Sequence, residues 1–242
     1  MKRTMLTLVV VMSILLCACQ KGDQSESSAE AYVGSESAAN PFDLDANLEA
    51  SAERETVSHG ETADHVAVNC LVDNPSFGDE RNFIRIIPYN EDGLIDLTTA
   101  ASREFTFEPG QRYGIVVYAH NVADPELGDD ALARGIGSTI SFPERINKNE
   151  EAQLSCIVSY QNGAETEFIS CAMPIRATAD IGFGVAKTGT IMNFGGQSQS
   201  ECPIWITASD NVVAMSCVPG GDLLPGLDNS SYMIYFVEAV AK

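Results

Sequence analysis

Basic residues are scarce in this sequence. The 242 residues include 14 lysines and arginines against 34 aspartates and glutamates, which gives a formal net charge of −20 at pH 7. A surface with this charge repels nucleic acid and anionic lipid headgroups. We therefore exclude nucleic acid as a partner and attribute the charge to solubility outside the cell. Attraction of divalent cations is the alternative explanation.

Common motifs of catalytic and metal centres are also missing. The chain contains no C-x-x-C, H-E-x-x-H, G-x-S-x-G or EF-hand pattern, so the corresponding zinc, hydrolase and calcium sites have no support. In the glycine-rich stretch 182–190 (GFGVAKTGT), Lys187 comes before Gly189, whereas a phosphate-binding loop needs its lysine directly after the last glycine. A strand and a turn explain this stretch better. We predict no catalytic residue and no cofactor, with calcium as the one alternative.

Aromatic residues are few, and Trp205 is the only tryptophan. They offer little of the stacking platform expected of a sugar-cleaving cleft, and we interpret Trp205 as a core or half-buried residue. Any two acidic side chains can still meet in a fold and act as acid and base. A carboxylate-dependent hydrolase working outside the cytoplasm is therefore an alternative function.

The N-terminus has the pattern of a lipoprotein signal. Two basic residues precede an apolar stretch, 5–16, which is too short to span a bilayer and is typical of a secretory signal. It ends in Leu16-Cys17-Ala18-Cys19, which resembles a bacterial lipobox. The resemblance implies that residues 1–18 are removed and that Cys19 is lipidated, which would anchor the protein stably at a bacterial membrane, outside the cytoplasm. An ordinary signal peptide cut nearby is the alternative.

Residues 19–64 are predicted to form an acidic, disordered tether. The segment is rich in serine, alanine and carboxylates, and such a composition does not bury enough surface to offset the entropy of an ordered chain. A short helix that starts at Asn40-Pro41 is the one local exception. The folded body is then expected over residues 65–242.

The body alternates apolar and polar residues with a period of two, which indicates β-strands. Residues 113–119 (YGIVVYA) are apolar on both faces and predict a central strand that is covered on both sides. Residues 153–160 (QLSCIVSY) alternate cleanly, and turn signals such as Asn162-Gly163 separate the runs. We predict an all-β fold, an antiparallel immunoglobulin-like sandwich. It is either one enlarged unit or two abutting ones that divide near residues 143–151.

Cysteine spacing predicts disulfides, which are the default in an exported chain. Two pairs are each separated by 15 residues, namely Cys156 with Cys171 and Cys202 with Cys217. A two-residue turn at Asn162-Gly163 would set Cys156 opposite Ile169. A four-residue loop over 162–165 would instead set it directly opposite Cys171, close enough for a bond. A turn centred on Ser209-Asp210 does the same for the second pair. We favour these local pairings over pairings between hairpins or with Cys70.

His120 and Asn121 follow the central strand and lead into a loop rich in carboxylates. We expect Asn121 to bond the turn backbone and His120 to cap a neighbouring carbonyl. The alternative is a calcium site, because clustered carboxylates supply the hard oxygen ligands that calcium prefers. Its ligands would be Asp124, Glu126, Asp129 and Asp130. A calcium- or small-ligand-binding module is therefore a further alternative function.

Five segments of the body, taken in order, resemble a known kind of module. They are DNPSFGDERNFIRI (73–86), EPGQRYGIVVYAHNVADP (108–125), GIGSTISFP (135–143), GVAKTGTIMNFGG (184–196) and LPGLDNSSYMIYFV (224–237). Together they resemble an uncharacterised extracellular β-sandwich module of bacterial surface proteins. The sequence departs from that pattern at HNVADP (120–125) and in its extra cysteines. The resemblance implies a secreted or wall-associated β domain and implies no enzymatic activity.

These observations favour a membrane-anchored surface lipoprotein that displays a β-sandwich. Its expected work is adhesion, envelope structure or presentation of a binding surface, without catalysis. Its expected partners are the membrane, through the lipid anchor, and a protein or glycan ligand.

Overall fold

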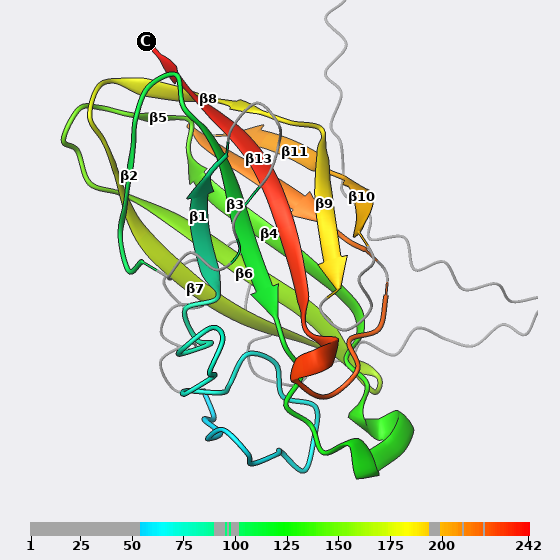
Figure 1. Cartoon of the computed structure of the whole chain (residues 1–242). Coiled ribbons are helices and arrows are strands. Elements are labelled where there is room, and N and C mark those ends of the chain that lie inside the picture. Colours follow the sequence, from blue (N-terminus) through cyan, green and yellow to red (C-terminus); the bar gives the residue numbers. More distant parts are fainter. Residues whose placement is uncertain are drawn as a thin grey trace, which may run out of the picture. The chain divides into compact units, whose positions relative to one another are not determined.

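The fold is a sandwich of two β-sheets (Figure 1). The computed structural model describes residues 54–89, 95, 97, 102–193, 199–209, 211–219 and 221–242. These residues form thirteen strands and two short 3-10 helices, η1 (Pro125–Ala131) and η2 (Leu227–Asn229). The predicted all-β sandwich is confirmed. The signal peptide, Cys19 and the short helix expected after Asn40-Pro41 lie outside the described residues.

The first sheet has seven strands in the described part of the chain. They are β1 (Ile84–Pro88), β3 (Arg112–Ala119), β5 (Arg145–Ile146), β8 (Ile181–Val185), β9 (Thr188–Asn193), β10 (Gln199–Pro203) and β13 (Ser231–Ala241). The order β1-β3-β13 is antiparallel, and β13 pairs along its other side with both β8 and β9. β5 extends the sheet from β8, and β10 extends it from β9.

The second sheet has six strands among the described residues. They are β2 (Phe105–Phe107), β4 (Arg134–Pro143), β6 (Ala152–Asn162), β7 (Glu165–Ala177), β11 (Trp205–Ser209) and β12 (Val212–Cys217). Their order is β11-β12-β4-β6-β7-β2. All these neighbours are antiparallel except β2 and β7.

Residues 143–151 do not divide the body into two sandwiches. β4 and β6 flank this polar segment and pair with each other in one sheet, while β5 between them joins the other sheet. The chain crosses to the opposite sheet and back within these residues. The described strands form one enlarged sandwich.

Strand β3 lies inside its sheet, between β1 and β13, and residues 113–119 are all buried, as its apolar pattern predicts. One face of the sheet packs on the opposite sheet. The other face is covered by the segment before β1, where Phe77 stacks on Tyr118 with ring centroids 4.2 Å apart. The guanidinium of Arg85 lies 3.8 Å from the centre of the Phe77 ring. Burial on both sides explains why β3 is apolar on both faces.

Residues 54–83 contain no regular strand or helix, yet they pack on the sandwich. The segment is the cyan trace at one end of the strands, the same end as η1 (Figure 1). Val57 and Ala63 are buried and form isolated bridges with Leu71 and Ala123. The predicted tether extended to residue 64, but ordered packing is present from residue 54 onward. The prediction was too long because the segment is rich in exposed charged residues and has only a few apolar residues, which are the ones that are buried.

Candidate functional site

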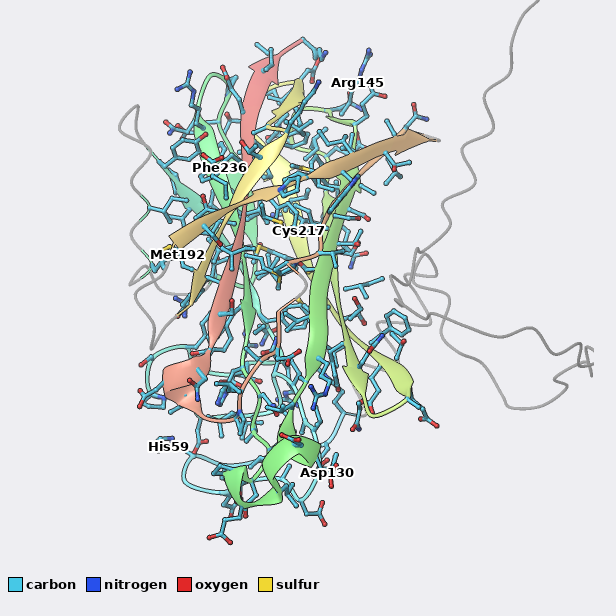
Figure 2. The ribbon with its side chains drawn as sticks, turned by 90° about the vertical axis from the view of Figure 1, so that its right-hand side faces the viewer. His59, Asp130, Arg145, Met192, Cys217 and Phe236 are labelled. Atoms are coloured by element: carbon cyan, nitrogen blue, oxygen red, sulfur yellow. A yellow bond between two sulfur atoms is a disulfide. The ribbon has the colours of Figure 1, made fainter. Side chains whose placement is uncertain are left out.

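An extended segment crosses from one sheet to the other along one side of the sandwich. β10 pairs with β9 in the seven-stranded sheet, and after Ile204 the chain continues as β11, which pairs with β12 in the six-stranded sheet (Figure 2). Ile204 is buried, and its N–H donates to the carbonyl of Lys187 at 2.9 Å. The candidate site lies next to this crossing, between β10 and the segment that follows β12.

A disulfide between Cys202 and Cys217 reinforces this crossing. Cys202 belongs to β10 of one sheet, Cys217 ends β12 of the other, and their Cα atoms are 6.5 Å apart. The predicted pairing is confirmed, but its predicted geometry is wrong. The hairpin turn lies between Ser209 and Val212, one residue later than predicted, so the bond links two sheets rather than opposed positions of one hairpin.

The other predicted pair, Cys156 and Cys171, lies in the expected register but forms no disulfide. Cys156 lies directly opposite Cys171, and the pairing continues to Asn162 and Glu165. Both thiols are free in the structure, so the disulfide predicted between them is not formed there. Burial raises the pKa of both thiols, that of Cys171 to about 12. Cys70 is also buried and free.

A hollow of about 470 Å³ lies beside the Cys202–Cys217 bond. Residues 200–203 of β10 form one side, residues 218, 219 and 221–224 form another, and η2 contributes Asp228 and Asn229. Ile136 and Leu223 are buried in its lining.

Two apolar side chains of the hollow remain in contact with solvent. Val218 is 55% exposed and Leu224 is 48% exposed. Three carboxylates line the same hollow, those of Glu201, Asp222 and Asp228, and its described lining contains no basic residue. The hollow therefore combines apolar contact surface with negative charge.

Trp205 lies outside the residues that line this hollow and is 52% exposed. Trp205 is therefore not a core residue, and about half of its surface is covered. It begins β11, an edge strand whose side chains at residues 205–208 are exposed on both faces. An alternating pattern does not indicate whether a strand lies inside a sheet or at its edge.

The acidic loop after β3 does not gather the four carboxylates of the alternative calcium site into one group. Asp124 caps η1, where its Oδ1 accepts the backbone N–H of Glu126 at 2.9 Å. The side chains of Glu126, Asp129 and Asp130 are exposed. Throughout the described ranges, no group of three or more His, Cys, Asp and Glu side chains is arranged to hold a metal ion.

Asn121 behaves as predicted. Its Nδ2 donates to the carbonyls of Ala131 and Leu223 at 2.7 and 3.0 Å, and its Oδ1 accepts the N–H of Ala123 at 3.1 Å. The expectation for His120 is wrong, because its Nδ1 lies 2.7 Å from Oε1 of Glu80 and does not cap a carbonyl.

Glu80 is the centre of a buried polar cluster that sequence reasoning missed. Glu80 is 0% exposed and His120 is 2% exposed. The Glu80 carboxylate also accepts bonds from Asn74 Nδ2 at 2.5 Å, from the Tyr118 hydroxyl at 3.4 Å and from the N–H of Leu71 at 3.3 Å. The cluster fastens the segment before β1 to the end of β3. The only sequence signal was an acidic residue close before an apolar strand, and most such residues are exposed.

Asn69 joins the same segment to β3 by three hydrogen bonds. Its side chain donates to the carbonyl of Tyr118 and accepts the N–H of His120, and its own N–H donates to the His120 carbonyl, each at 2.8 Å. The residue is fully buried. Buried polar groups satisfied in this way hold a loop in one conformation.

Comparison of the chain with models of known protein families, with curated proteins and with solved structures found no match. In the described part of the chain, none of the helices has the length and apolar character needed to cross a membrane.

Proposed function

We propose that this protein is a lipid-anchored binding protein of the bacterial envelope, and that the hollow beside Cys202–Cys217 is its ligand site. The lipobox pattern that ends at Cys19 supports the anchor. A disulfide and a strongly acidic sequence support a location outside the cytoplasm. The resemblance to a surface β-sandwich module points to the same location.

The observation that carries the proposal is the exposure of Val218 and Leu224 at a concave site. Ligand sites are typically hollows that combine apolar walls with a few polar groups. The disulfide crosslink beside the hollow restrains both of its walls, and a preformed site loses less entropy on binding. The hollow therefore has the shape, the composition and the support of a binding site.

Leu224→Asp tests this assignment. In the variant a ligand side chain that packs at residue 224 loses an apolar contact and removes a carboxylate from water, and both changes cost free energy. We expect binding to envelopes of the source bacterium to weaken about tenfold or more, which corresponds to about 1.4 kcal/mol. The measurement is saturable co-sedimentation of the chain carrying Cys19→Ser, so that lipid insertion does not mask the ligand.

Trp205→Asp is the matched control, because it also replaces a half-exposed apolar residue by a carboxylate but lies outside the hollow. We expect the control to bind as the parent does. Equal binding by Leu224→Asp and the parent would show that the ligand does not use the hollow. Loss confined to Trp205→Asp would move the site to the β11 edge.

A further inference from the structure

The geometry points to a particular occupant of the hollow. We propose that it takes an extended, basic segment of another protein, which adds as a strand to the free edge of β10. The inference rests on the proposed function, because it names the class of ligand for the same site.

The position of the hollow along the edge of β10 supports strand addition. Four consecutive residues of β10, 200–203, line the hollow. Successive side chains of a strand point to opposite faces, so four consecutive lining residues are typical of a hollow that runs beside the strand's edge. β10 pairs with β9 on one side, and within the described ranges no strand pairs with its other side.

An edge strand presents backbone groups that a new strand can use. Unpaired N–H and C=O groups on such an edge are a template for another chain. Pro203, which has no N–H to donate, is typical of an edge strand. In recognition by strand addition, main-chain hydrogen bonds supply affinity and pockets for alternate side chains supply specificity. Here Val218 and Leu224, with buried Ile136 beneath them, provide the apolar contacts.

The charge of the hollow selects a basic segment. Asp222 has a basic neighbour, since its Oδ2 lies 3.5 Å from Nη1 of Arg134. Within the described residues, Glu201 and Asp228 form no ion pair. Lysine or arginine side chains of an incoming strand would neutralise both carboxylates, which favours the correct partner and its rate of association.

The same charge argues against two other occupants. The segment that precedes the sandwich is itself acidic, and a second copy of the chain carries the same net charge of −20. Like charges at an interface oppose association. The occupant is therefore expected to come from a different, basic protein.

Synthetic peptides test the proposal directly. The probe is an end-capped octapeptide of alternating lysine and valine, titrated calorimetrically into the purified full chain in non-ionic detergent. We expect it to bind at least about tenfold more tightly than the same peptide with glutamate in place of lysine. A lysine peptide with every backbone nitrogen methylated lacks the N–H groups needed for strand addition, and we expect it to lose binding.

Two double variants distinguish the effect of the carboxylates in the hollow from the effect of the protein's net charge. Glu201→Gln with Asp228→Asn should weaken binding of the lysine peptide about tenfold. Glu108→Gln with Glu144→Gln changes the net charge equally at exposed residues toward the other end of the sandwich, the end where Arg145 lies (Figure 2). That control should bind within about twofold of the parent.

Three results would overturn the inference. They are no binding of the lysine peptide, equal binding of its methylated form, and equal weakening by the two double variants. The envelope experiment with Leu224→Asp is independent of these peptides. Loss of envelope binding in that variant, combined with no binding of the lysine peptide, would retain the hollow as the ligand site and reject the basic strand as its occupant.

Discussion

Glu80→Ala is expected to lower the free energy of unfolding by about 3–5 kcal/mol, because it removes a buried acceptor that several hydrogen-bond donors share. Glu80 and His120 are both sealed from solvent, with Oε1 and Nδ1 2.7 Å apart. Alanine would leave the His120 ring without its partner and would remove the acceptor used by Asn74 and Leu71. Each buried donor left without an acceptor costs about 1–3 kcal/mol, and these costs are not additive. The measurement is the urea midpoint at unchanged slope.

Asp79→Ala is the matched control for this prediction. Asp79 precedes Glu80 and forms an ion pair with Arg81, which is substantially exposed, with 39% of its side chain accessible. Exposed ion pairs contribute about 0–1 kcal/mol, so we expect a loss in that range. A Glu80→Ala loss as small as that of the control would show that the buried cluster does not hold residues 54–83 on the sandwich.

Loss of the Cys202–Cys217 bond is expected to lower the free energy of unfolding by about 3 kcal/mol, the contribution of a crosslink that closes a loop of this length. The two cysteines are 15 residues apart and join the two sheets. The crosslink restricts the unfolded chain, and in the folded chain it braces the side of the sandwich that carries the hollow. The measurement compares urea midpoints with and without a reductant.

The double variant Cys202→Ser with Cys217→Ser provides the control for reduction. The other described cysteines are free thiols, so a reductant has no further bond to break among them. We expect the reductant to shift the midpoint of the parent and to leave that of the variant unchanged. A shift of similar size in both proteins would identify another disulfide, with Cys156 and Cys171 as the first candidates because of their opposed register.

Strand positions were predictable because they depend on local patterns. The apolar run of β3 and the alternation of β6 record burial of alternate faces directly in the sequence. The opposed register of Cys156 and Cys171 is the one given by the longer of the two loops considered. The backbone bonds of Asn121 followed from its position after a strand. Each of these features is decided within a few residues of the chain.

Features that depend on distant contacts were not predictable in the same way. Glu80 and His120 are in contact although they are 40 residues apart in the sequence, and no local pattern indicates that the Glu80 carboxylate is buried. Trp205 is exposed because β11 lies at a sheet edge, a property of the sheet order rather than of the strand. The hollow has the same origin, since residues 200–203 meet residues 218, 219 and 221–224 only when the crossing segment joins the two sheets.

The central claim is that an exported, lipid-anchored chain displays this disulfide-braced sandwich, and an intact mass of the protein from its native membrane tests it most directly. We predict a chain that begins at Cys19 and carries acyl mass. Alkylation under denaturing conditions should add three groups without reduction, at Cys70, Cys156 and Cys171, and two more after reduction of the Cys202–Cys217 bond. A chain that begins at Met1, without acyl mass and with Cys202 and Cys217 alkylated before reduction, would contradict the claim.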